Sequence, residues 1–302
     1  MVQDLALLTA KNGRPYAKFK MSDKTGSIEA MLFEYDPEPA HTLKDGEVFF
    51  LSGKMDSYNG KIQCKPTNSI TKMDVFELND FTKATKYDIE EMWSKLVNYI
   101  ATFEHHNLKA VAEDIMLRNE WAPLFKRCPA ATGMHHAFIG GLLEHTLEMV
   151  EIGDLLLKQS CFKGKVDRDL SLFGLMFHDF GKIFEYSPEA GFKKIESGIL
   201  VGHIPMVSAA VYHSCAMLGV PDEERNHMMH VILAHHGQII WGSPVEMATP
   251  EAAFVHYIDN MHATVFGFLQ RIEDNPGREF VKHGYANNTI VARRFNEQQA
   301  SI

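Results

Sequence analysis

Histidine and aspartate, residue types that often bind transition metals, recur in a distinctive order in the second half of the chain. The order is His145, the pair His178-Asp179, His203, the doublet His235-His236, and then Asp259. Residues 105–262 hold 14 of the 16 histidines of this 302-residue chain. Neutral imidazole is the commonest metal ligand in proteins, although a single buried histidine is more often an ordinary core residue. The ordered set therefore predicts a metal site where no single member would.

The set is large enough to bind two metal ions. Two ions about 3.5–4 Å apart can share a carboxylate and a water molecule, which they deprotonate near neutral pH. Asp179 is predicted to bridge them, because its two oxygens can reach both ions. The other ligands divide into His145, His178 and Asp259 for one ion and His203, His235 and His236 for the other. Imidazole and carboxylate ligands suit Mn²⁺, Fe²⁺, Ni²⁺ or Zn²⁺ and argue against an all-oxygen Ca²⁺ site.

Four further residues of this half are candidates for contact with a substrate. Lys182 lies one turn after Asp179, where it could act in catalysis by neutralising a non-bridging phosphoryl oxygen. His135 and His136 precede the first metal-binding segment and could contact a phosphate or stabilise a loop. Trp241 could stack on a terminal base, or pack within its own loop.

Two of the remaining histidines flank the last predicted ligand. His256 lies one helical turn before Asp259, and His262 one turn after it. Each could orient a metal ligand through a hydrogen bond, or be an ordinary core residue. The sequence leaves the roles of the remaining histidines open.

The elements that position these residues are predicted to be helices. From Asp88, a residue type favoured as an N-cap, apolar residues recur at i, i+3, i+4 and i+7 as far as Phe103, and again over 108–116. Further helices are predicted at 139–158, 169–180, 202–218, 222–236 and 250–272. This half is therefore predicted to be all-α, with most of the ligands near helix ends.

The first 80 residues alternate between polar and apolar side chains, which is typical of half-buried strands. About five strands fit here, near residues 5–10, 16–21, 27–35, 48–53 and 62–67. Asn59-Gly60 is a strong hairpin signal between the last two. Five short strands in this length favour an OB-fold over an SH3-like or other small barrel.

Lysines and a tyrosine in this half suggest contact with single-stranded nucleic acid. The candidate residues are Lys18, Lys20, Tyr58 and Lys61, together with Lys54 and Lys65. Cations can follow the phosphates while an aromatic ring stacks on a base. The alternative is an ordinary solvated strand face, since residues 1–80 carry 10 basic and 12 acidic side chains.

We therefore expect a multidomain α and β protein, in which a small N-terminal OB-type barrel precedes an all-α helical bundle. The predicted parts are a barrel at 1–78, a linker and the start of the first helix at 79–92, a helical domain at 93–275 and an extension at 276–302. The net charge of −9 argues against nucleic-acid binding by the whole surface, but it is compatible with a local basic groove.

The cysteines and the N-terminus indicate a cytoplasmic protein. The four cysteines lack C-x-x-C spacing, which argues against a zinc ribbon or disulfide framework and suits a reducing compartment. The chain shows no signal peptide and no apolar run of about 18 residues, so we expect no membrane contact. The sequence does not determine the oligomeric state, and a homo-oligomer is one of the options.

These motifs resemble a known superfamily. The order of histidines and aspartates is similar to that of the HD-domain metal-dependent phosphohydrolases. The strings HHAFIGGLLEHT (135–146), FHDFGK (177–182) and HHG (235–237), behind an OB-like domain with KNGRPY (11–16) and DKTG (23–26), resemble the YhaM-type 3′→5′ exoribonucleases. The resemblance covers nearly the whole chain. It implies Mn²⁺-favoured removal of nucleotides from the 3′ ends of single-stranded RNA, with single-stranded DNA as a further candidate.

One comparison within the superfamily argues against a cyclic-dinucleotide substrate. Phosphodiesterases of the HD-GYP type carry Gly-Tyr-Pro soon after the His-His pair, whereas this chain has GQIIWGSP at 237–244. Gly141 stands where some of those enzymes place a metal-binding glutamate. This glycine favours two metal ions and argues against a cyclic-dinucleotide substrate.

The leading prediction is an exonuclease that hydrolyses the terminal phosphodiester with a metal-bound hydroxide and releases nucleoside monophosphates. A second hypothesis is a phosphohydrolase of free nucleotides, in which the barrel serves assembly or regulation. A third is a single-strand binding protein with a vestigial metal site, against which the intact ligand set argues.

Overall fold

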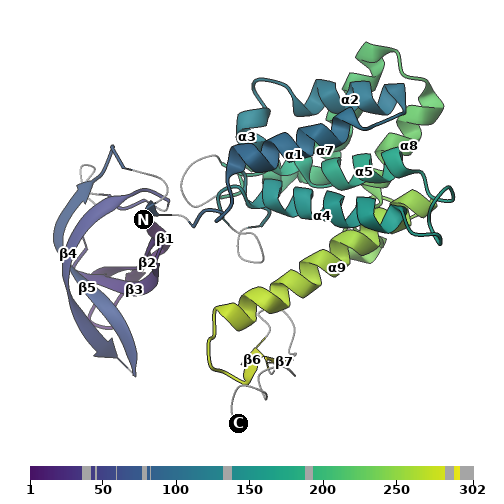
Figure 1. Cartoon of the computed structure of the whole chain (residues 1–302). Coiled ribbons are helices and arrows are strands. Elements are labelled where there is room, and N and C mark those ends of the chain that lie inside the picture. The colour runs from purple at the N-terminus through teal and green to yellow at the C-terminus, as the bar shows by residue number, and fades with distance from the viewer. Residues whose placement is uncertain are drawn as a thin grey trace, which may run out of the picture.

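The structure is a computed structural model that describes residues 1–35, 42–44, 46–58, 60–76, 80–81, 83–131, 138–187, 193–282 and 289–292. It has two parts, a curled β-sheet formed by the N-terminal residues and a body of helices formed by the rest (Figure 1). The change of periodicity near Asp88 predicted this division, and the predicted fold class is confirmed.

Five strands form the N-terminal sheet. They are β1 (Val2–Thr9), β2 (Pro15–Asp23), β3 (Gly26–Phe33), β4 (Phe49–Tyr58) and β5 (Lys61–Lys72). Their order is β1-β2-β3-β5-β4, with β3 and β5 parallel and the other neighbours antiparallel. Tyr58 pairs with Lys61, as the hairpin signal predicts, and Gly60 has φ +75°, although Asn59 itself lies outside the described residues.

The sheet curls around a small apolar core, as an OB-type barrel does. Ala17 and Phe19 of β2 and Ala30 and Leu32 of β3 point into it, because alternate residues of a strand face opposite sides. Val2 exchanges two backbone hydrogen bonds with the segment that leads into β4, donating to the Glu47 carbonyl at 3.0 Å. These bonds bring the two outer strands of the sheet towards each other.

The helical body contains the predicted helices and several shorter ones. The α-helices are α1 (Ile89–Ala101), α2 (His106–Met116), α3 (Ala122–Arg127), α4 (Gly141–Leu157), α5 (Arg168–Phe177), α6 (Glu196–Leu200), α7 (His203–Leu218), α8 (Asp222–Leu233) and α9 (Pro250–Glu273), with short 3₁₀ helices η2 (Phe180–Phe184) and η3 (Ile239–Trp241). Asp88 caps α1 as predicted, accepting from the Glu91 amide at 2.8 Å. The sequence analysis missed α3 and α6, which are too short to show a helical period.

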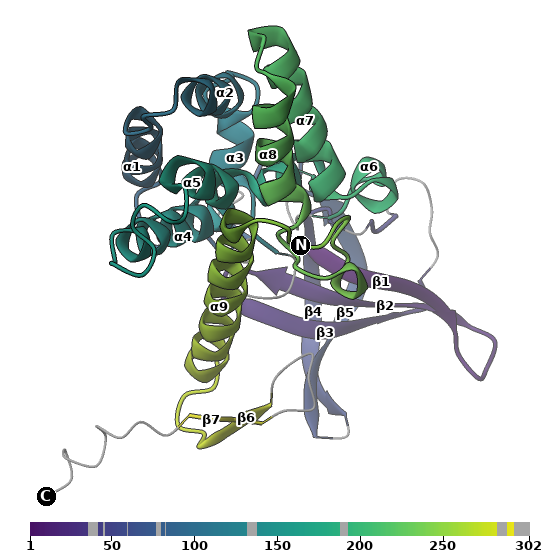
Figure 2. The same cartoon turned by 90° about the vertical axis from the view of Figure 1, so that its right-hand side faces the viewer.

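Helix α5 lies at the centre of the helical body. Every residue from Asp169 to Phe177 is buried, and the helix packs against α4, α8 and α9. A helix that is apolar on most of its surface needs neighbours all around it. Helices α7 and α8 lie side by side over the same core (Figure 2). The rigid centre fixes where α5 ends, immediately before His178.

The segment between the two parts contacts both of them. Lys24 of the sheet pairs with Asp80 at 2.7 Å, and Ala84 forms a β-bridge with Ile139 just before α4. At the other end of the chain, β6 (Phe280–Lys282) and β7 (Thr289–Val291) form a two-stranded sheet in the segment predicted as an extension. Within the described residues, no helix has the length and apolar character needed to span a bilayer.

Candidate metal centre

All seven predicted ligands lie in the described part of the chain, and the helices bring them together. His145 belongs to the second turn of α4, His178 and Asp179 follow α5, and His203 begins α7. The doublet follows α8, and Asp259 lies within α9. Two groups form, whose ligand atoms lie within 4.8 Å of one another: His145, His178 and Asp179, and then His203, His235 and His236. These are the two sets into which the sequence divided the histidines.

The Asp179 carboxylate lies between the two groups and presents one oxygen to each. Its Oδ2 is 3.3 Å from His178 Nε2 and 3.8 Å from His145 Nε2. Its Oδ1 is 3.3 Å from His203 Nε2 and 4.0 Å from His235 Nε2. A carboxylate in this position can bind an ion on each side.

Asp259 lies beside the first group. Its Oδ1 is 3.5 Å from His145 Nε2 and 3.8 Å from His178 Nε2. The two imidazoles meet at these same nitrogens, which are 3.3 Å apart. Two nitrogens and two carboxylate oxygens thus surround one point, as in a metal site with imidazole and carboxylate ligands.

Hydrogen bonds on the other ring nitrogens orient three of the histidines. Nδ1 of His178 is 3.0 Å from the Leu175 carbonyl, and Nδ1 of His235 is 2.7 Å from the Ile232 carbonyl. Because a carbonyl oxygen only accepts, both Nδ1 atoms carry the proton, and both Nε2 atoms are left with a lone pair. Glu185 has the same effect on His203, at 3.1 Å from its Nδ1. Such partners are typical of histidines that ligate metals.

The second group holds buried nitrogens that the protein itself does not satisfy. Among the described residues, Nε2 of His203, Nε2 of His235 and Nδ1 of His236 have no hydrogen-bond partner. An unpaired buried polar atom is costly and calls for a reason. Three nitrogen ligands that converge beside a carboxylate oxygen fit a borderline transition-metal ion.

Lys182 and Asp179 form a buried ion pair next to these groups. Lys182 Nζ donates to Asp179 Oδ2 and to the Ala130 carbonyl, both at 2.6 Å. Burial alone would raise the pKa of Asp179, but the Lys182 ammonium holds it well below its usual value. Burial lowers the pKa of Lys182, but Asp179 outweighs this effect and raises it. Both groups therefore stay charged.

The imidazoles of His145 and His235 are kept neutral, as metal ligands must be. Burial lowers the pKa of His145 to about 3, although Asp259 opposes this shift. Burial also lowers the pKa of His235, well below its usual value. Neutral rings in a dry site present their lone pairs to a cation without first losing a proton.

Two glycines of the sequence motifs allow close approach, of the backbone at the start of α7 and of the His256 ring. A Cβ on Gly181 would overlap the main-chain carbonyl of His203, the first residue of α7. Gly237 has φ +84°, and a Cβ there would overlap the ring of His256. The absence of a side chain at Gly181 and Gly237 thus lets α7 and α9 lie close to the candidate ligands.

The other predicted residues of this half have different outcomes. His135 and His136 lie outside the described residues. Trp241 lies on η3 with 55% of its surface exposed, and its ring stacks on His256 at 5.9 Å between centroids. His256 in turn hydrogen-bonds to the carbonyl of His235 at 2.7 Å. The Trp241 ring therefore packs against His256 while much of its surface remains open to solvent. Its contact with a base stays a prediction.

The four barrel residues predicted to contact a substrate share the outer face of the sheet. Lys18 and Lys20 alternate with the buried Ala17 and Phe19, so they point outward. Directly paired residues lie on the same face, and one outer row runs across β2, β3, β5 and β4 as Lys20, Glu29, Gln63 and Asp56. Lys61 and Tyr58 lie two residues along from Gln63 and Asp56, so they face the same side.

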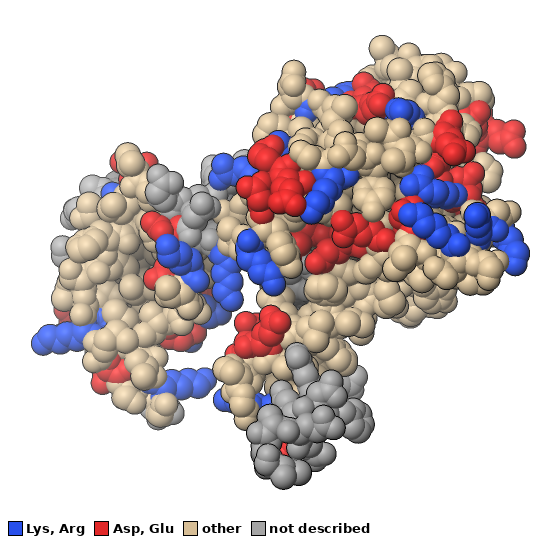
Figure 3. All heavy atoms as spheres, viewed as in Figure 1, with Lys and Arg blue, Asp and Glu red and all other residues tan. Residues whose placement is uncertain are grey.

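The sequence analysis missed an aromatic pair on this face. Phe33 of β3 pairs with Tyr16 of β2, and their rings stack at 5.9 Å. Phe33 is 47% exposed, and the pair lies next to Lys18 along β2. Alternation placed Tyr16 on the face of Lys18, but only the strand register reveals Phe33. Lysine and acidic side chains are interspersed on the visible face of the molecule, without a continuous basic stripe (Figure 3).

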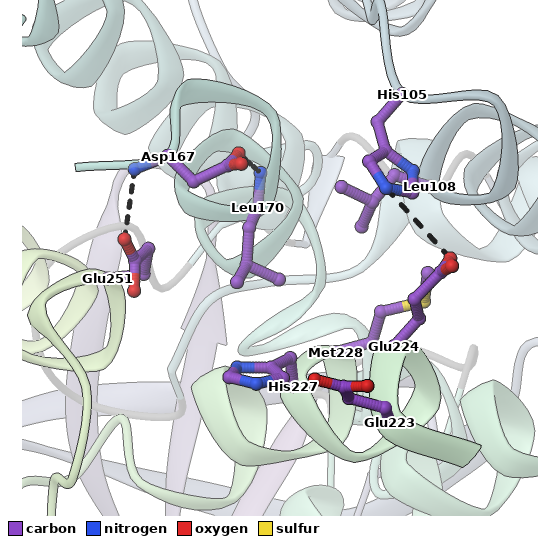
Figure 4. A pocket seen from close by; sticks show the side chains of 9 residues that line it. All are labelled: His105, Leu108, Asp167, Leu170, Glu223, Glu224, His227, Met228 and Glu251. Carbon is purple, nitrogen blue, oxygen red and sulfur yellow. Dashed lines mark hydrogen bonds and ion pairs between the residues drawn. The ribbon is translucent and has the colours of Figure 1, made fainter. Parts of the chain in front are cut away.

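A pocket of about 300 Å³ lies at the opposite ends of α5 and α8 from the metal ligands (Figure 4). Acidic side chains in its lining accept hydrogen bonds from groups at or near helix ends. Asp167 accepts from the Leu170 amide, and Glu251 accepts from the Asp167 amide, both at 2.9 Å. Glu224 accepts from Asn107 at 2.8 Å. These bonds hold the helices together at the end remote from the site.

The comparisons with known proteins agree with this geometry. Residues 142–264 match the family model of the HD domain, and this range contains all seven candidate ligands. The fold and the site thus define a protein with an HD domain behind an OB-like sheet.

The relatives identify the family more closely. The 3′-5′ exoribonuclease YhaM of Geobacillus sp. is 32% identical over 92% of this chain and 85% of its own length. The YhaM proteins of Halalkalibacterium halodurans and Shouchella clausii are 30% and 31% identical, over 98% and 85% of this chain and over 92% and 79% of their own lengths. The chain belongs to the YhaM family of 3′-5′ exoribonucleases. No solved structure matches it significantly.

The close approach at Gly181 leads to a first prediction. Gly181→Ala should move the start of α7, because the added methyl group overlaps the His203 carbonyl. We expect at least a tenfold loss of Mn²⁺ affinity, measured by titration calorimetry. Gly267→Ala in α9 is the matched control, because a Cβ there meets no atom within 4 Å. Unchanged Mn²⁺ affinity in a folded Gly181→Ala protein would contradict this role.

Proposed function

We propose that this protein is a metal-dependent 3′→5′ exoribonuclease that hydrolyses the terminal phosphodiester of single-stranded RNA and releases nucleoside monophosphates. The observation that carries the proposal is Asp179, whose oxygens face two separate histidine groups. Membership of the YhaM family supports the direction and the substrate. Single-stranded DNA is a second substrate to be tested.

The cofactor in this proposal is a pair of divalent ions, with Mn²⁺ favoured over Fe²⁺, Ni²⁺ or Zn²⁺. His145, His178 and Asp259 would hold one ion, His203, His235 and His236 the other, and Asp179 both. Bound there, the ions would supply an acidified water and positive charge for the phosphate. Three nitrogens and a carboxylate oxygen around the second position support this assignment.

Lys182 has two roles in the proposed reaction. It holds Asp179 in place through the 2.6 Å hydrogen bond and keeps that carboxylate ionised. Two of its three N–H groups point at Asp179 and the Ala130 carbonyl. We assign the third to a non-bridging phosphoryl oxygen, where the ammonium opposes the charge that builds up during attack.

The outer face of the sheet would hold the RNA strand. Lys18, Lys20 and Lys61 would follow the phosphates, while Tyr58 and the Tyr16–Phe33 pair offer rings to the bases. At the active-site end we propose contacts from His135, His136 and Trp241. The ion pairs on the sheet are exposed, such as Lys18 with Glu29 at 3.4 Å, so a phosphate can compete for the lysine.

The free thiols support a place of action in the cytoplasm. Cys64, Cys128 and Cys215 are buried free cysteines, and Cys161 is exposed and free. Such thiols persist where glutathione keeps them reduced. A cytoplasmic nuclease would also meet its RNA substrate there.

The two alternative functions receive less support. A phosphohydrolase of free nucleotides would leave the cationic and aromatic face of the sheet without a role. A binding protein with a vestigial site would not need seven candidate ligands in two groups, or the hydrogen bonds that orient them. The curated relatives, moreover, carry the name of an exoribonuclease.

The direct test uses single-stranded RNA labelled at its 5′ end, with Mn²⁺. We expect a ladder that shortens from the 3′ end, and Asp179→Ala should reduce the rate at least 10³-fold, because both metal positions lose their shared oxygen donor. Asp222→Asn, an exposed aspartate on α8, is the matched control. Intact RNA alongside hydrolysed free nucleotides would favour the alternative enzyme, and unchanged degradation by Asp179→Ala would exclude this site as the catalyst.

The role of the sheet gives a separate prediction. Phe33→Ala should weaken binding of a single-stranded RNA of about 12 nucleotides by about 5- to 100-fold, the range expected for one stacked base. Hydrolysis of a dinucleotide should stay unchanged, since its binding is proposed to involve only the active-site end. Phe280→Ala in β6 replaces another exposed phenylalanine and serves as the control. Equal binding by the wild type and Phe33→Ala would remove this face from the RNA path.

A further inference from the structure

A second layer of polar side chains lies behind His145, on the side away from the metal positions. Nδ1 of His145 is 3.1 Å from Nδ1 of His262 on α9, and Nε2 of His262 is 2.9 Å from Glu148 Oε2 on α4. His145 and His262 are each 1% exposed. A carboxylate and a buried histidine thus form a chain of hydrogen bonds that ends on a candidate ligand.

When His262 carries a single proton, the partners in this series of hydrogen bonds determine where each proton lies. A carboxylate only accepts, so Nε2 of His262 carries the proton that Glu148 receives. A neutral imidazole has one N–H, so Nδ1 of His262 is an acceptor. Nδ1 of His145 must then carry the proton that His262 accepts. Nε2 of His145 is left with its lone pair, 3.3 Å from Nε2 of His178, where the first ion would lie.

We propose that Glu148 and His262 are positioning residues that hold His145 in its metal-binding tautomer. This inference rests on the proposed metal centre. Without the hydrogen bonds from Glu148 through His262, His145 could place its proton on Nε2, and a protonated nitrogen cannot bind a metal ion. The position of His262 one turn after Asp259 already suggested such a role, whereas no motif marked Glu148.

The position of His145 within α4 explains why side chains of other residues, and not a backbone carbonyl, must set its tautomer. His178 and His235 follow the ends of α5 and α8, where the last carbonyls lack an i+4 helical partner, and the carbonyls of Leu175 and Ile232 bond to their Nδ1 atoms. His145 lies in the second turn of α4, where the helix itself uses the carbonyls. Its second nitrogen must therefore find a partner on another element.

Packing holds the His262 ring in the required orientation. The ring stacks on Phe266, one turn further along α9, with centroids 4.2 Å apart and planes at 20°. It meets the His145 ring at 4.9 Å and 60°. Helices α4 and α9 pack against each other, which brings Glu148 to His262. This series of hydrogen bonds therefore joins α4, which carries His145, to α9, which carries Asp259.

Manganese affinity of the purified full-length protein tests the proposal without reference to activity. We expect Glu148→Ala and His262→Phe to raise the Kd for Mn²⁺ by about 10- to 100-fold, as is typical when a partner of a ligating histidine is removed. Glu148→Gln keeps an oxygen acceptor and should recover most of the affinity. Glu151→Ala, an exposed residue of α4, is the matched control and should bind like the wild type.

The tautomer itself can be observed by nitrogen NMR of ¹⁵N-histidine-labelled, metal-free protein. In the wild type, His145 should carry its proton on Nδ1, and in Glu148→Ala the Nε2–H form should appear. Glu148 is partly exposed, so this variant remains informative if His262→Phe fails to fold. Wild-type Mn²⁺ affinity in folded Glu148→Ala, or an unchanged His145 tautomer, would overturn the proposal. Absence of Mn²⁺ binding by the wild type would instead reject the metal centre.

Discussion

The arrangement of this protein depends on a buried carboxylate placed between two groups of imidazoles. Asp179 is 6% exposed, and an isolated charge in such a place is costly. Lys182 offsets part of this cost through an ion pair at 2.6 Å, and the histidine nitrogens on both sides could hold cations that offset the rest. The requirement for positive charge around Asp179 links the burial of the site to its proposed chemistry.

The helices bring the histidines to Asp179 because several of them end or begin beside this carboxylate. Helix α5, buried on all sides, fixes His178 and Asp179, while α7 begins and α8 ends beside them. Gly181 allows the start of α7 to approach without a steric clash. Backbone carbonyls at helix ends, which lack an i+4 helical partner, then orient His178 and His235. The same packing that stabilises the body thus sets the tautomers of its ligands.

Much of this could be predicted from the sequence, because it depends on local order. Periodicity predicted the change from strands to helices at Asp88. The ordered histidines and aspartates marked the candidate ligands, whereas the packing of separate helices brings them together. The contacts of Glu148 and Glu185 could not be predicted, since they depend on how separate elements cross. Phe33 was missed for a similar reason, because its stacking on Tyr16 follows from strand register. Helices α3 and α6 are too short for a period to appear.

The most direct test of the account is anomalous X-ray diffraction from crystals of the protein grown with Mn²⁺. We expect two manganese peaks, one on each side of the Asp179 carboxylate and about 3.5–4 Å apart. One ion should contact His145, His178 and Asp259, and the other His203, His235 and His236. A single peak, or manganese bound away from Asp179, would contradict the central claim that this carboxylate joins two metal positions.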